Sequence, residues 1–382
     1  MARSPLILAA LAKAAKADLS LARTVELTSG NAGYFDAALI TDQAGENYVL
    51  RMPRNSRAYL DLQTELHALK ALRAVAGSLP FEFPRLLGST KDSDGVPAIL
   101  LSYVYGGEID IANLSGTDAF ATNLGTALAA LHNLPASVVE QAGLPIYTSS
   151  DVVKQKVALM DRAAATGLVP AALLQRWETA LEDVNLFRFT PTVVHGELTG
   201  GTVLEEQGQV GGVLGWNHLQ VGDPAEDFRW LSGGALPSTF EDAMLNYRAA
   251  RPSADENFAQ RAMLYSELEL GTWLLHCLAV GDPEQIKQAE ELLVELKDNL
   301  EAGNLKDLTA TSFVGLAAAA AIIPAATPTQ ELSAVAQEPE PAVEEIEEVT
   351  AASIFDEVAG IDNDEAIDSE RETKETNLDE LF

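Results

Sequence analysis

The chain has 382 residues, of which 47% are hydrophobic, and it carries a formal net charge of −32 at pH 7. This length supports a sizeable core in two lobes, and the negative charge argues against nucleic acid and anionic membranes as partners. The single cysteine, Cys277, excludes an intramolecular disulfide. It is expected to be a buried hydrophobic residue in a reducing, cytoplasmic compartment.

The N-terminal region is predicted to be a short helix followed by strands. Lys13 and Lys16 interrupt the apolar residues of the first stretch, which argues against a signal peptide and favours an amphipathic helix. From 24 to 54, apolar and polar residues alternate between turn residues at 31–33 and 43–46. This pattern predicts a three-stranded antiparallel meander.

A helix and two more strands are expected next. Residues 56–75 form the predicted helix, with Glu65 on the side opposite its leucines. These leucines recur near helical spacing, at Leu60, Leu62, Leu66, Leu69 and Leu72. Residues 81–87 and 96–104 are predicted strands, and the second is apolar on both faces, as a buried strand should be. Together with the preceding elements they form a predicted small lobe, residues 1–106.

The rest of the folded region is predicted to be mostly helical. Helical patterns cover 117–134, 149–186 and 238–301, with capping residues and prolines at several starts. His132, at the end of the first of these helices, is expected to be a packing residue. These helices are predicted to form a large lobe, residues 107–308.

One stretch, residues 191–231, interrupts the helices with a different pattern. An apolar, β-branched run at 192–194 leads into a loop that carries His195-Gly196-Glu197. A second short strand at 202–204 leaves the loop, and a glycine-rich turn at 208–212 is predicted to bring residues 213–214 back beside it.

This stretch resembles the catalytic segment of the aminoglycoside and macrolide phosphotransferase family, small-molecule kinases with a protein-kinase-like fold. The family pattern is His-Gly-Asp, four residues, Asn, an apolar-Asp-Trp strand end, Gly-Asp-Pro and a further Asp. The chain keeps His195, Gly196, Trp216, Gly222-Asp223-Pro224 and Asp227. The resemblance implies an α+β, bilobal fold with a small β-rich lobe and a large helical lobe.

The resemblance also implies a nucleotide site and ATP as its cofactor. The residues that it places there are Gly30, Gly33, Arg51, Glu65, Ser102 and Val104. The two glycines would let backbone N–H groups cover the phosphates, and Arg51, paired with Glu65, would hold them. Backbone groups of Ser102 and Val104 would meet the adenine at the hinge between the lobes.

The chain departs from the family pattern at three positions that take part in catalysis or metal binding. The catalytic Asp is Glu197, the metal-binding Asn is Thr202, and the metal-binding Asp is Gly215. A displacement of about 1 Å at a reacting centre can cost on the order of 100-fold in rate, and Mg²⁺ needs the oxygen ligands that are missing here. Asp223 and Asp227, by contrast, are implied to support the architecture of the loop.

Residues 309–382 are predicted to be a disordered acidic tail. From residue 310 onward, eighteen Asp and Glu residues stand against two basic residues. Apolar residues among these acids are candidate anchors for a protein partner, although a solvated tail fits the pattern equally. The candidate anchors are Ile354, Phe355, Leu378, Leu381 and Phe382. The apolar run at 313–323 is too short to span a bilayer, so no transmembrane segment is expected.

Three functions remain open at this point. The first is a catalytically impaired pseudokinase that acts as a nucleotide-binding or protein-binding regulator, with Mg²⁺ doubtful as a cofactor. The second is a working ATP-dependent kinase for a hydroxylated small molecule, with Glu197 as the base and Asp223 or Glu197 recruiting magnesium. The third is a structural scaffold without a nucleotide site.

Overall fold

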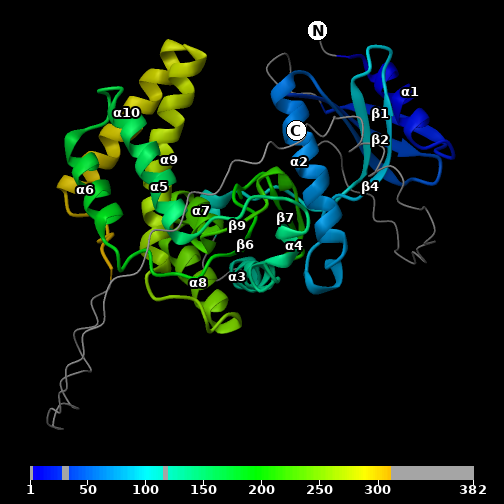
Figure 1. Cartoon of the computed structure of the whole chain (residues 1–382). Coiled ribbons are helices and arrows are strands. Elements are labelled where there is room, and N and C mark those ends of the chain that lie inside the picture. Colours follow the sequence, from blue (N-terminus) through cyan, green and yellow to red (C-terminus); the bar gives the residue numbers. More distant parts are fainter. Residues whose placement is uncertain (1–2, 28–33, 115–118, 311–382) are drawn as a thin grey trace, which may run out of the picture.

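The computed structural model describes residues 3–27, 34–114 and 119–310. A lobe built on a β-sheet lies beside a larger, mostly helical lobe (Figure 1). The elements of the first lobe are α1 (Pro5–Ala15), β1 (Leu21–Glu26), β2 (Phe35–Asp42), β3 (Asn47–Pro53), α2 (Ser56–Arg73), η1 (Ala76–Ser78), β4 (Leu86–Lys91) and β5 (Pro97–Ser102).

The sheet of the small lobe is antiparallel, with the strand order β1-β2-β3-β5-β4. Alternate residues of β5 face opposite sides of the sheet. Leu100 packs into a cluster with Leu8 of α1, whereas Ile99 packs into the main core with Leu62 of α2. The sheet is therefore covered on one face by α1 and on the other by α2. The predicted meander and the predicted N-terminal helix are both present.

Two expectations for the small lobe are wrong in detail. Leu60 is 58% exposed and Glu65 only 2% exposed, the reverse of the predicted arrangement. Glu65 follows Leu62 by three residues and precedes Leu69 by four, so all three lie on the buried face of α2. The strand expected from residue 81 begins only at Leu86, because residues 81–85 make one isolated bridge instead.

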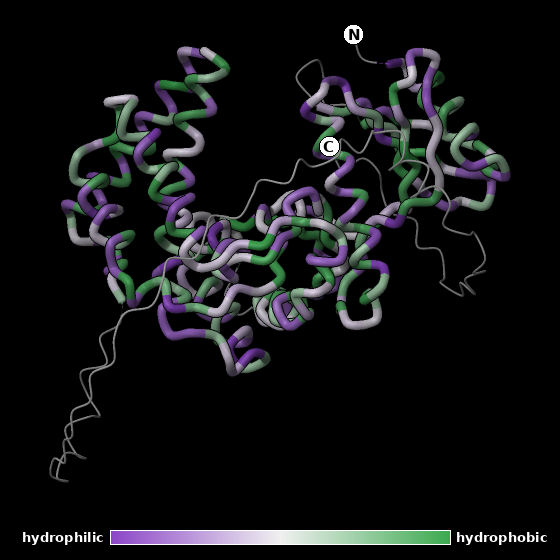
Figure 2. Tube along the Cα trace, viewed as in Figure 1, coloured by the Kyte–Doolittle hydropathy of each residue, from purple (hydrophilic) through white to green (hydrophobic). Residues whose placement is uncertain are grey.

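The large lobe consists mainly of helices. They are η2 (Ile111–Asn113), α3 (Ala119–His132), α4 (Ser137–Glu140), α5 (Ser149–Ala164), α6 (Ala171–Glu182), η3 (Trp216–His218), η4 (Pro224–Phe228), α7 (Arg229–Gly234), α8 (Pro237–Ala250), α9 (Phe258–Val280) and α10 (Pro283–Glu301). Hydrophilic and hydrophobic stretches alternate along the outer helices α9 and α10 (Figure 2), as expected for helices with one face on a core. Cys277 is buried in α9, as predicted. None of the described helices is long and apolar enough to cross a membrane.

Four short strands lie within the large lobe. β6 (Thr192–Val194) pairs with β9 (Gln220–Gly222), and β7 (Val203–Glu206) pairs with β8 (Gln209–Val213). The predicted turn at 208–212 is wrong, because the chain already reverses at Gln207 and Gly208. Gly212 lies inside β8, where a Cβ atom would come within 2.1 Å of Val104 Cγ1. The glycine therefore permits a close approach between this hairpin and the hinge.

Helices α3 and α8 also make a close contact that requires a glycine. A Cβ atom on Gly125 would lie 2.1 Å from the carbonyl oxygen of Ala243 and 2.8 Å from the backbone nitrogen of Tyr247. Since both obstacles are backbone atoms, the helices must separate to admit a methyl group.

We expect Gly125→Ala to destabilise the protein by about 1–3 kcal/mol, because overpacking at this crossing outweighs the better helix propensity of alanine. Chemical denaturation measures the change in the free energy of unfolding. The matched control is Gly77→Ala, since a Cβ atom at Gly77 meets nothing within 4 Å. Equal stability of the two variants would contradict the close-contact argument.

Candidate functional site

The loop after β6 is held by one buried carboxylate, that of Asp227 in η4. Its two oxygens accept hydrogen bonds from the backbone N–H of His195 at 2.8 Å and of Gly196 at 2.7 Å. Gly196 has a φ of +85°, and a Cβ atom there would lie 2.7 Å from the carbonyl oxygen of His218. Asp227 thus fixes a tight turn that only glycine fits, and residue 197 follows directly after this turn.

Two histidines complete this arrangement in their neutral form. His132 bonds Asp227 Oδ2 through Nε2 at 3.0 Å and Tyr247 Oη through Nδ1 at 2.8 Å. His195 bonds the carbonyl oxygen of Leu214 through Nε2 at 2.8 Å, and its Nδ1 accepts from the Glu197 backbone N–H at 3.3 Å. Burial lowers the pKa of both imidazoles. His132 is therefore more than the packing residue that the sequence suggested, because it also ties α3 to the loop.

Glu197 lies at the catalytic position of the pattern, and its carboxylate is paired. Glu197 Oε2 lies 2.9 Å from Nε2 of His218, and the two side chains are 49% and 40% exposed. The hydrogen bond from His218 lowers the pKa of Glu197 and outweighs the opposing effect of partial burial. His218 was not predicted from the sequence, although it lies only three residues after Gly215.

Residues 202 and 215, which hold metal ligands in the resembling pattern, lie next to each other but offer few ligand atoms here. A Cβ atom on Gly215 would lie 3.4 Å from Thr202 Cγ2, so the fold does bring these positions together. Thr202 Oγ1 accepts a hydrogen bond from the Thr199 backbone N–H at 2.8 Å and donates to the Thr199 carbonyl at 3.1 Å. Its hydroxyl is thus occupied within its own loop, and Gly215 supplies no ligand atom.

Asp223 does not replace the missing ligands. It is buried, and it forms an ion pair with Arg261 at 2.6 Å and accepts a hydrogen bond from Tyr265 Oη, also at 2.6 Å. Its other oxygen accepts from the Ala225 backbone N–H at 2.9 Å. Within the described residues, no group of three or more His, Cys, Asp and Glu side chains is placed to hold a metal ion. These residues therefore do not fit magnesium in the way that the resembling family binds it.

In the small lobe, Arg51 and Glu65 form the contact that the resemblance implied. Arg51 Nη1 lies 2.6 Å from Glu65 Oε2, and its guanidinium stacks 4.2 Å from the centre of the Phe35 ring. A cavity of about 280 Å³ opens beside this pair. Asn217 of η3 lines the same cavity, a residue that sequence reasoning missed because its role depends on how η3 packs against α2.

Ser102 and Val104, which the resemblance places at the hinge between the lobes, differ in their backbone hydrogen bonds. Ser102 donates its backbone N–H to the Arg85 carbonyl at 2.9 Å, and its hydroxyl accepts from the Arg85 N–H. The backbone N–H and C=O of Val104 have no hydrogen-bond partner among the described residues. Of these two, Val104 alone offers both backbone groups to a ligand.

Several predicted residues lie outside the part of the chain that the structure describes. Gly30 and Gly33 fall in the range 28–33, so the predicted phosphate-covering turn has no structural account. The same holds for the candidate partner anchors Ile354, Phe355, Leu378, Leu381 and Phe382.

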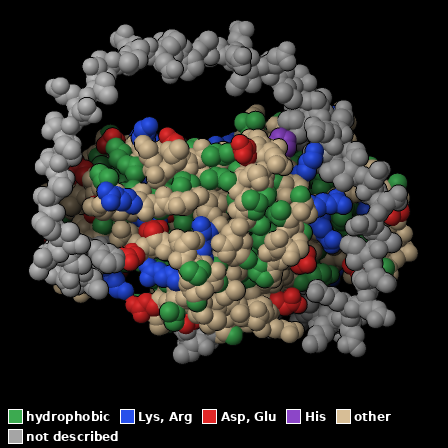
Figure 3. Space-filling view, turned by 60° about the horizontal axis from the view of Figure 1, so that its bottom comes forward, with side chains coloured by type: hydrophobic (Ala, Val, Ile, Leu, Met, Phe, Trp, Pro, Cys, Tyr) green, Lys and Arg blue, Asp and Glu red, His purple; other side chains and the backbone are tan. Residues whose placement is uncertain are grey.

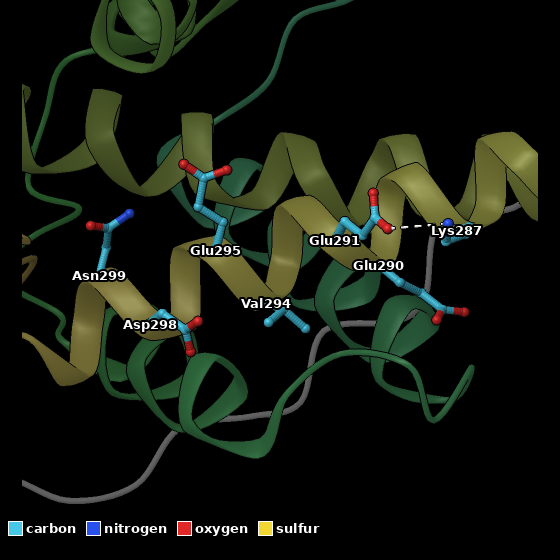
Figure 4. Close-up of a pocket in the computed structure, with 7 residues that line it drawn as sticks. All are labelled: Lys287, Glu290, Glu291, Val294, Glu295, Asp298 and Asn299. Carbon is cyan, nitrogen blue, oxygen red and sulfur yellow. Dashed lines mark ion pairs between the residues drawn. The ribbon is translucent and has the colours of Figure 1, made fainter.

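A larger hollow lies away from these motifs, on the surface of α10. Its lining residues, all from this one helix, include four carboxylates, one of which is Glu291, paired with Lys287 at 3.5 Å (Figure 4). An acidic helix face of this kind is typical of a solvated surface. On the face shown in Figure 3, basic and acidic side chains are interspersed and do not gather into one patch.

Comparison with known sequences gives a family and two relatives. The pattern of the phosphotransferase enzyme family matches residues 29–269. Viomycin phosphotransferase of Streptomyces vinaceus is 30% identical over 227 residues, which cover 56% of this chain and 77% of that protein. The uncharacterized protein YcbJ of Bacillus subtilis (strain 168) is 26% identical over 206 residues, 51% of this chain and 65% of YcbJ, so the chain spans slightly less than two thirds of that relative.

Solved structures share the fold. The apoenzyme of macrolide 2'-phosphotransferase MphH from Brachybacterium faecium superposes with a TM-score of 0.63 at 24% identity, over 75% of this chain and 97% of its own. The GDP complex of wild-type aminoglycoside 2'-phosphotransferase-IIIa gives 0.61 at 20% identity, over 78% and 100%. The predicted bilobal, kinase-like α+β fold is confirmed.

The buried histidines predict a loss of stability in mild acid. Each folded-state pKa lies below the usual 6.5, so the unfolded chain takes up the protons first. Stability is then complete above about pH 6.5 and falls as the pH decreases, by up to about 1.4 kcal/mol per pH unit for each group. In denaturation series from pH 7.5 to 5.5, His132→Gln should flatten this slope. The exposed His276→Gln should leave it unchanged, and an equal slope in all three proteins would refute the assignment.

Proposed function

Because this chain belongs to the phosphotransferase enzyme family, we propose that it is a pseudokinase of that family. It retains the frame of the fold, lacks metal-dependent phosphoryl transfer, and acts as a nucleotide-binding or protein-binding regulator. The retained frame is the set of contacts around Asp227, and the lost part is the ligand set at residues 202 and 215.

The observation that carries this proposal is that neither Thr202 nor Gly215 offers an available metal ligand. Phosphoryl transfer depends on charge neutralisation by a metal on the phosphates and on positioning of the attacking hydroxyl. Here one position has no side chain, and the other has a hydroxyl that is already bonded to Thr199. The positioning carboxylate, Glu197, is one methylene longer and engages His218.

Two features support nucleotide binding without catalysis. The backbone groups of Val104 have no partner in the part of the chain that the structure describes, and Arg51 is held by Glu65 at the position that would meet phosphates. Structures of the same fold are solved with GDP, as in wild-type aminoglycoside 2'-phosphotransferase-IIIa, and with ADP, as in APH(2'')-Ib. The acidic tail remains a candidate for binding a protein partner, on the evidence of its composition alone.

A working small-molecule kinase is the second candidate. It is favoured by the exposure of Glu197, whose carboxylate is half accessible and therefore within reach of an acceptor hydroxyl. In this alternative Glu197 is the base, and magnesium would have to be recruited without Asp223, because both oxygens of that side chain are already bonded.

Thermal unfolding with ATP, with and without magnesium, separates these candidates from a plain scaffold. A ligand at about 100 times its dissociation constant stabilises the folded state by about 2.7 kcal/mol. We expect ATP to stabilise the chain equally with and without magnesium. Turnover that depends on magnesium and vanishes in Glu197→Ala would establish the kinase instead, and no stabilisation in either condition would favour the scaffold.

Restoring the family residues is expected to restore metal dependence. Gly215 has φ +78° and ψ +45°, a conformation that Asp adopts more readily than most residues with a Cβ atom, and its nearest neighbour is the side chain of Thr202. The triple variant Glu197→Asp, Thr202→Asn, Gly215→Asp should therefore gain magnesium-dependent stabilisation by ATP. Gly215→Ala is the matched control for the backbone conformation, because it adds a Cβ atom without a carboxylate. An identical magnesium response in wild type and triple variant would argue against the proposal.

A further inference from the structure

Helix α1 is apolar on its outer face as well as on the face that packs against the sheet. Leu8 and Ala12 are buried, whereas Leu6 is 84% exposed, more than any other large hydrophobic side chain among the described residues. A helix on a protein surface normally has polar residues opposite its apolar stripe. The outer α1 face instead consists of exposed apolar residues at i, i+4 spacing and one neighbour, namely Leu6, Ala10, Ala14 and Ile7.

The same helix differs in charge from the rest of the chain. Residues 3–17 contain three basic residues and no Asp or Glu, although the whole chain carries −32. Lys13 follows Leu6 by seven residues, about two helical turns, so it borders the outer α1 face. Its Nζ donates to the carbonyl oxygens of Ala17 at 2.6 Å and Leu19 at 2.7 Å, and it forms no ion pair with any described residue. Because an ammonium has three N–H donors, one donor and the charge remain available.

The position of α1 leaves this face open to a ligand. In Figure 1, α1 lies at the edge of the small lobe that is remote from the large lobe. An exposed apolar helix face beside a cation that lacks an anionic partner fits a peptide with apolar side chains and carboxylates.

Residues 377–382 of this chain have that chemistry. They lie outside the described residues and read Asn-Leu-Asp-Glu-Leu-Phe. Leu378, Leu381 and Phe382 stand at i, i+3 and i+4, which is the spacing of one helix face, and the two residues after Leu378 are acidic.

Other occupants fit the outer α1 face less well. Ile354 and Phe355, the other apolar candidates in the tail, are adjacent in the sequence and would point about 100° apart on a helix. Pairing with α1 of a second copy would bring together two helices with the same positive charge. Each copy also carries a net charge of −32, so the two chains repel each other.

The chain is long enough to bring this segment to α1. The described residues end at Ala310, whose backbone N–H donates to Asp183 Oδ2 of the large lobe at 2.8 Å. Residues 311–376 then lead to the segment. A flexible chain of that length spans about 45 Å on average and on the order of 200 Å when extended, whereas a folded region of about 300 residues is roughly 50 Å across. An attached segment also acts at an effective concentration of about millimolar.

We propose that residues 377–382 bind to the outer α1 face of the same chain, with their apolar side chains on Leu6 and Ile7 and a carboxylate beside Lys13 Nζ. An exposed ion pair contributes little affinity, so the apolar contact supplies most of the binding and the charge favours an acidic segment. The inference goes beyond the proposed function, since it places the tail against its own chain and not against a nucleotide or an external protein.

Zero-length cross-linking of the full chain with the carbodiimide EDC tests this contact, because EDC joins an amine only to a carboxylate that touches it. We expect mass spectrometry to find Lys13 joined to Asp379 or Glu380. Lys154 on α5, whose side chain is 76% exposed, is the matched control amine and should not be joined to this segment. In a mixture of unlabelled and ¹⁵N-labelled protein, the cross-link should join residues of one chain.

Single substitutions on both sides of the contact test its apolar part. Leu6→Ser should lower the rate of this cross-link by about threefold or more, because serine removes apolar contact area. Leu245→Ser on α8, a leucine that is 68% exposed, is the matched control and should leave the rate unchanged. In the tail, Leu381→Ser should lower the rate, whereas Phe355→Ser should not.

Several outcomes would overturn this contact. These are absence of a cross-link between Lys13 and residues 377–382, an equal yield at Lys154, which would indicate random collisions, and an unchanged rate in Leu6→Ser. A cross-link found only between differently labelled chains would assign the face to a second copy and would also overturn the proposal. Phosphotransferase activity in the wild-type protein would refute the proposed function without changing the cross-link, so the two failures are distinguishable.

Discussion

The geometry of the loop after β6 depends on one buried carboxylate. Asp227 receives two backbone N–H groups from the loop after β6 and one imidazole from α3, so it joins three separate segments. Burial alone would raise its pKa, but the hydrogen bonds from His132 and Gly196 lower it, and the group is held as an anion. Removing one partner of such a buried network is far more costly than removing an exposed ion pair, because the backbone N–H groups of His195 and Gly196 would lose their acceptor.

The residues that support the fold around this loop therefore differ from the residues at the catalytic and metal-ligand positions of the family pattern. The frame consists of buried groups whose loss would destabilise the fold, as Asp223 with Arg261 also illustrates. The chemical positions, Glu197, Thr202 and Gly215, lie in loops and contribute little to the core. Substitution at them is therefore expected to cost little stability. A chain of this family can thus keep its fold while the residues at these positions change.

Local patterns were sufficient to predict much of the fold. Alternation predicted the meander of β1, β2 and β3, and capping and spacing predicted the helices. The errors arose where contacts between segments distant in the sequence determine the position of a residue. Glu65 of α2 is buried because its carboxylate pairs with Arg51 of β3, and Gly212 permits a close approach to Val104 instead of forming a turn.

The candidate site was predictable as far as the motif extends. His195, Arg51, Glu65 and Asp227 were found because the resembling family has residues at those positions. Asn217 and His218 were missed because their roles depend on the packing of η3 against α2 and the loop, and no local pattern encodes that packing. Val104 and Ser102 were predicted alike, but only their hydrogen bonds with other segments distinguish them.

The hairpin of β7 and β8 is fastened to the hinge. Gly107 and Glu205 exchange two backbone hydrogen bonds of 2.8 Å, and Glu82 bonds both Gly211 and Val213. A displacement of residue 82 or 107 would therefore also shift the hairpin, and with it the segment that leads to Gly215. The hairpin thus couples the segment before β4 to the segment after β5 through backbone hydrogen bonds, which do not depend on the identity of the side chains.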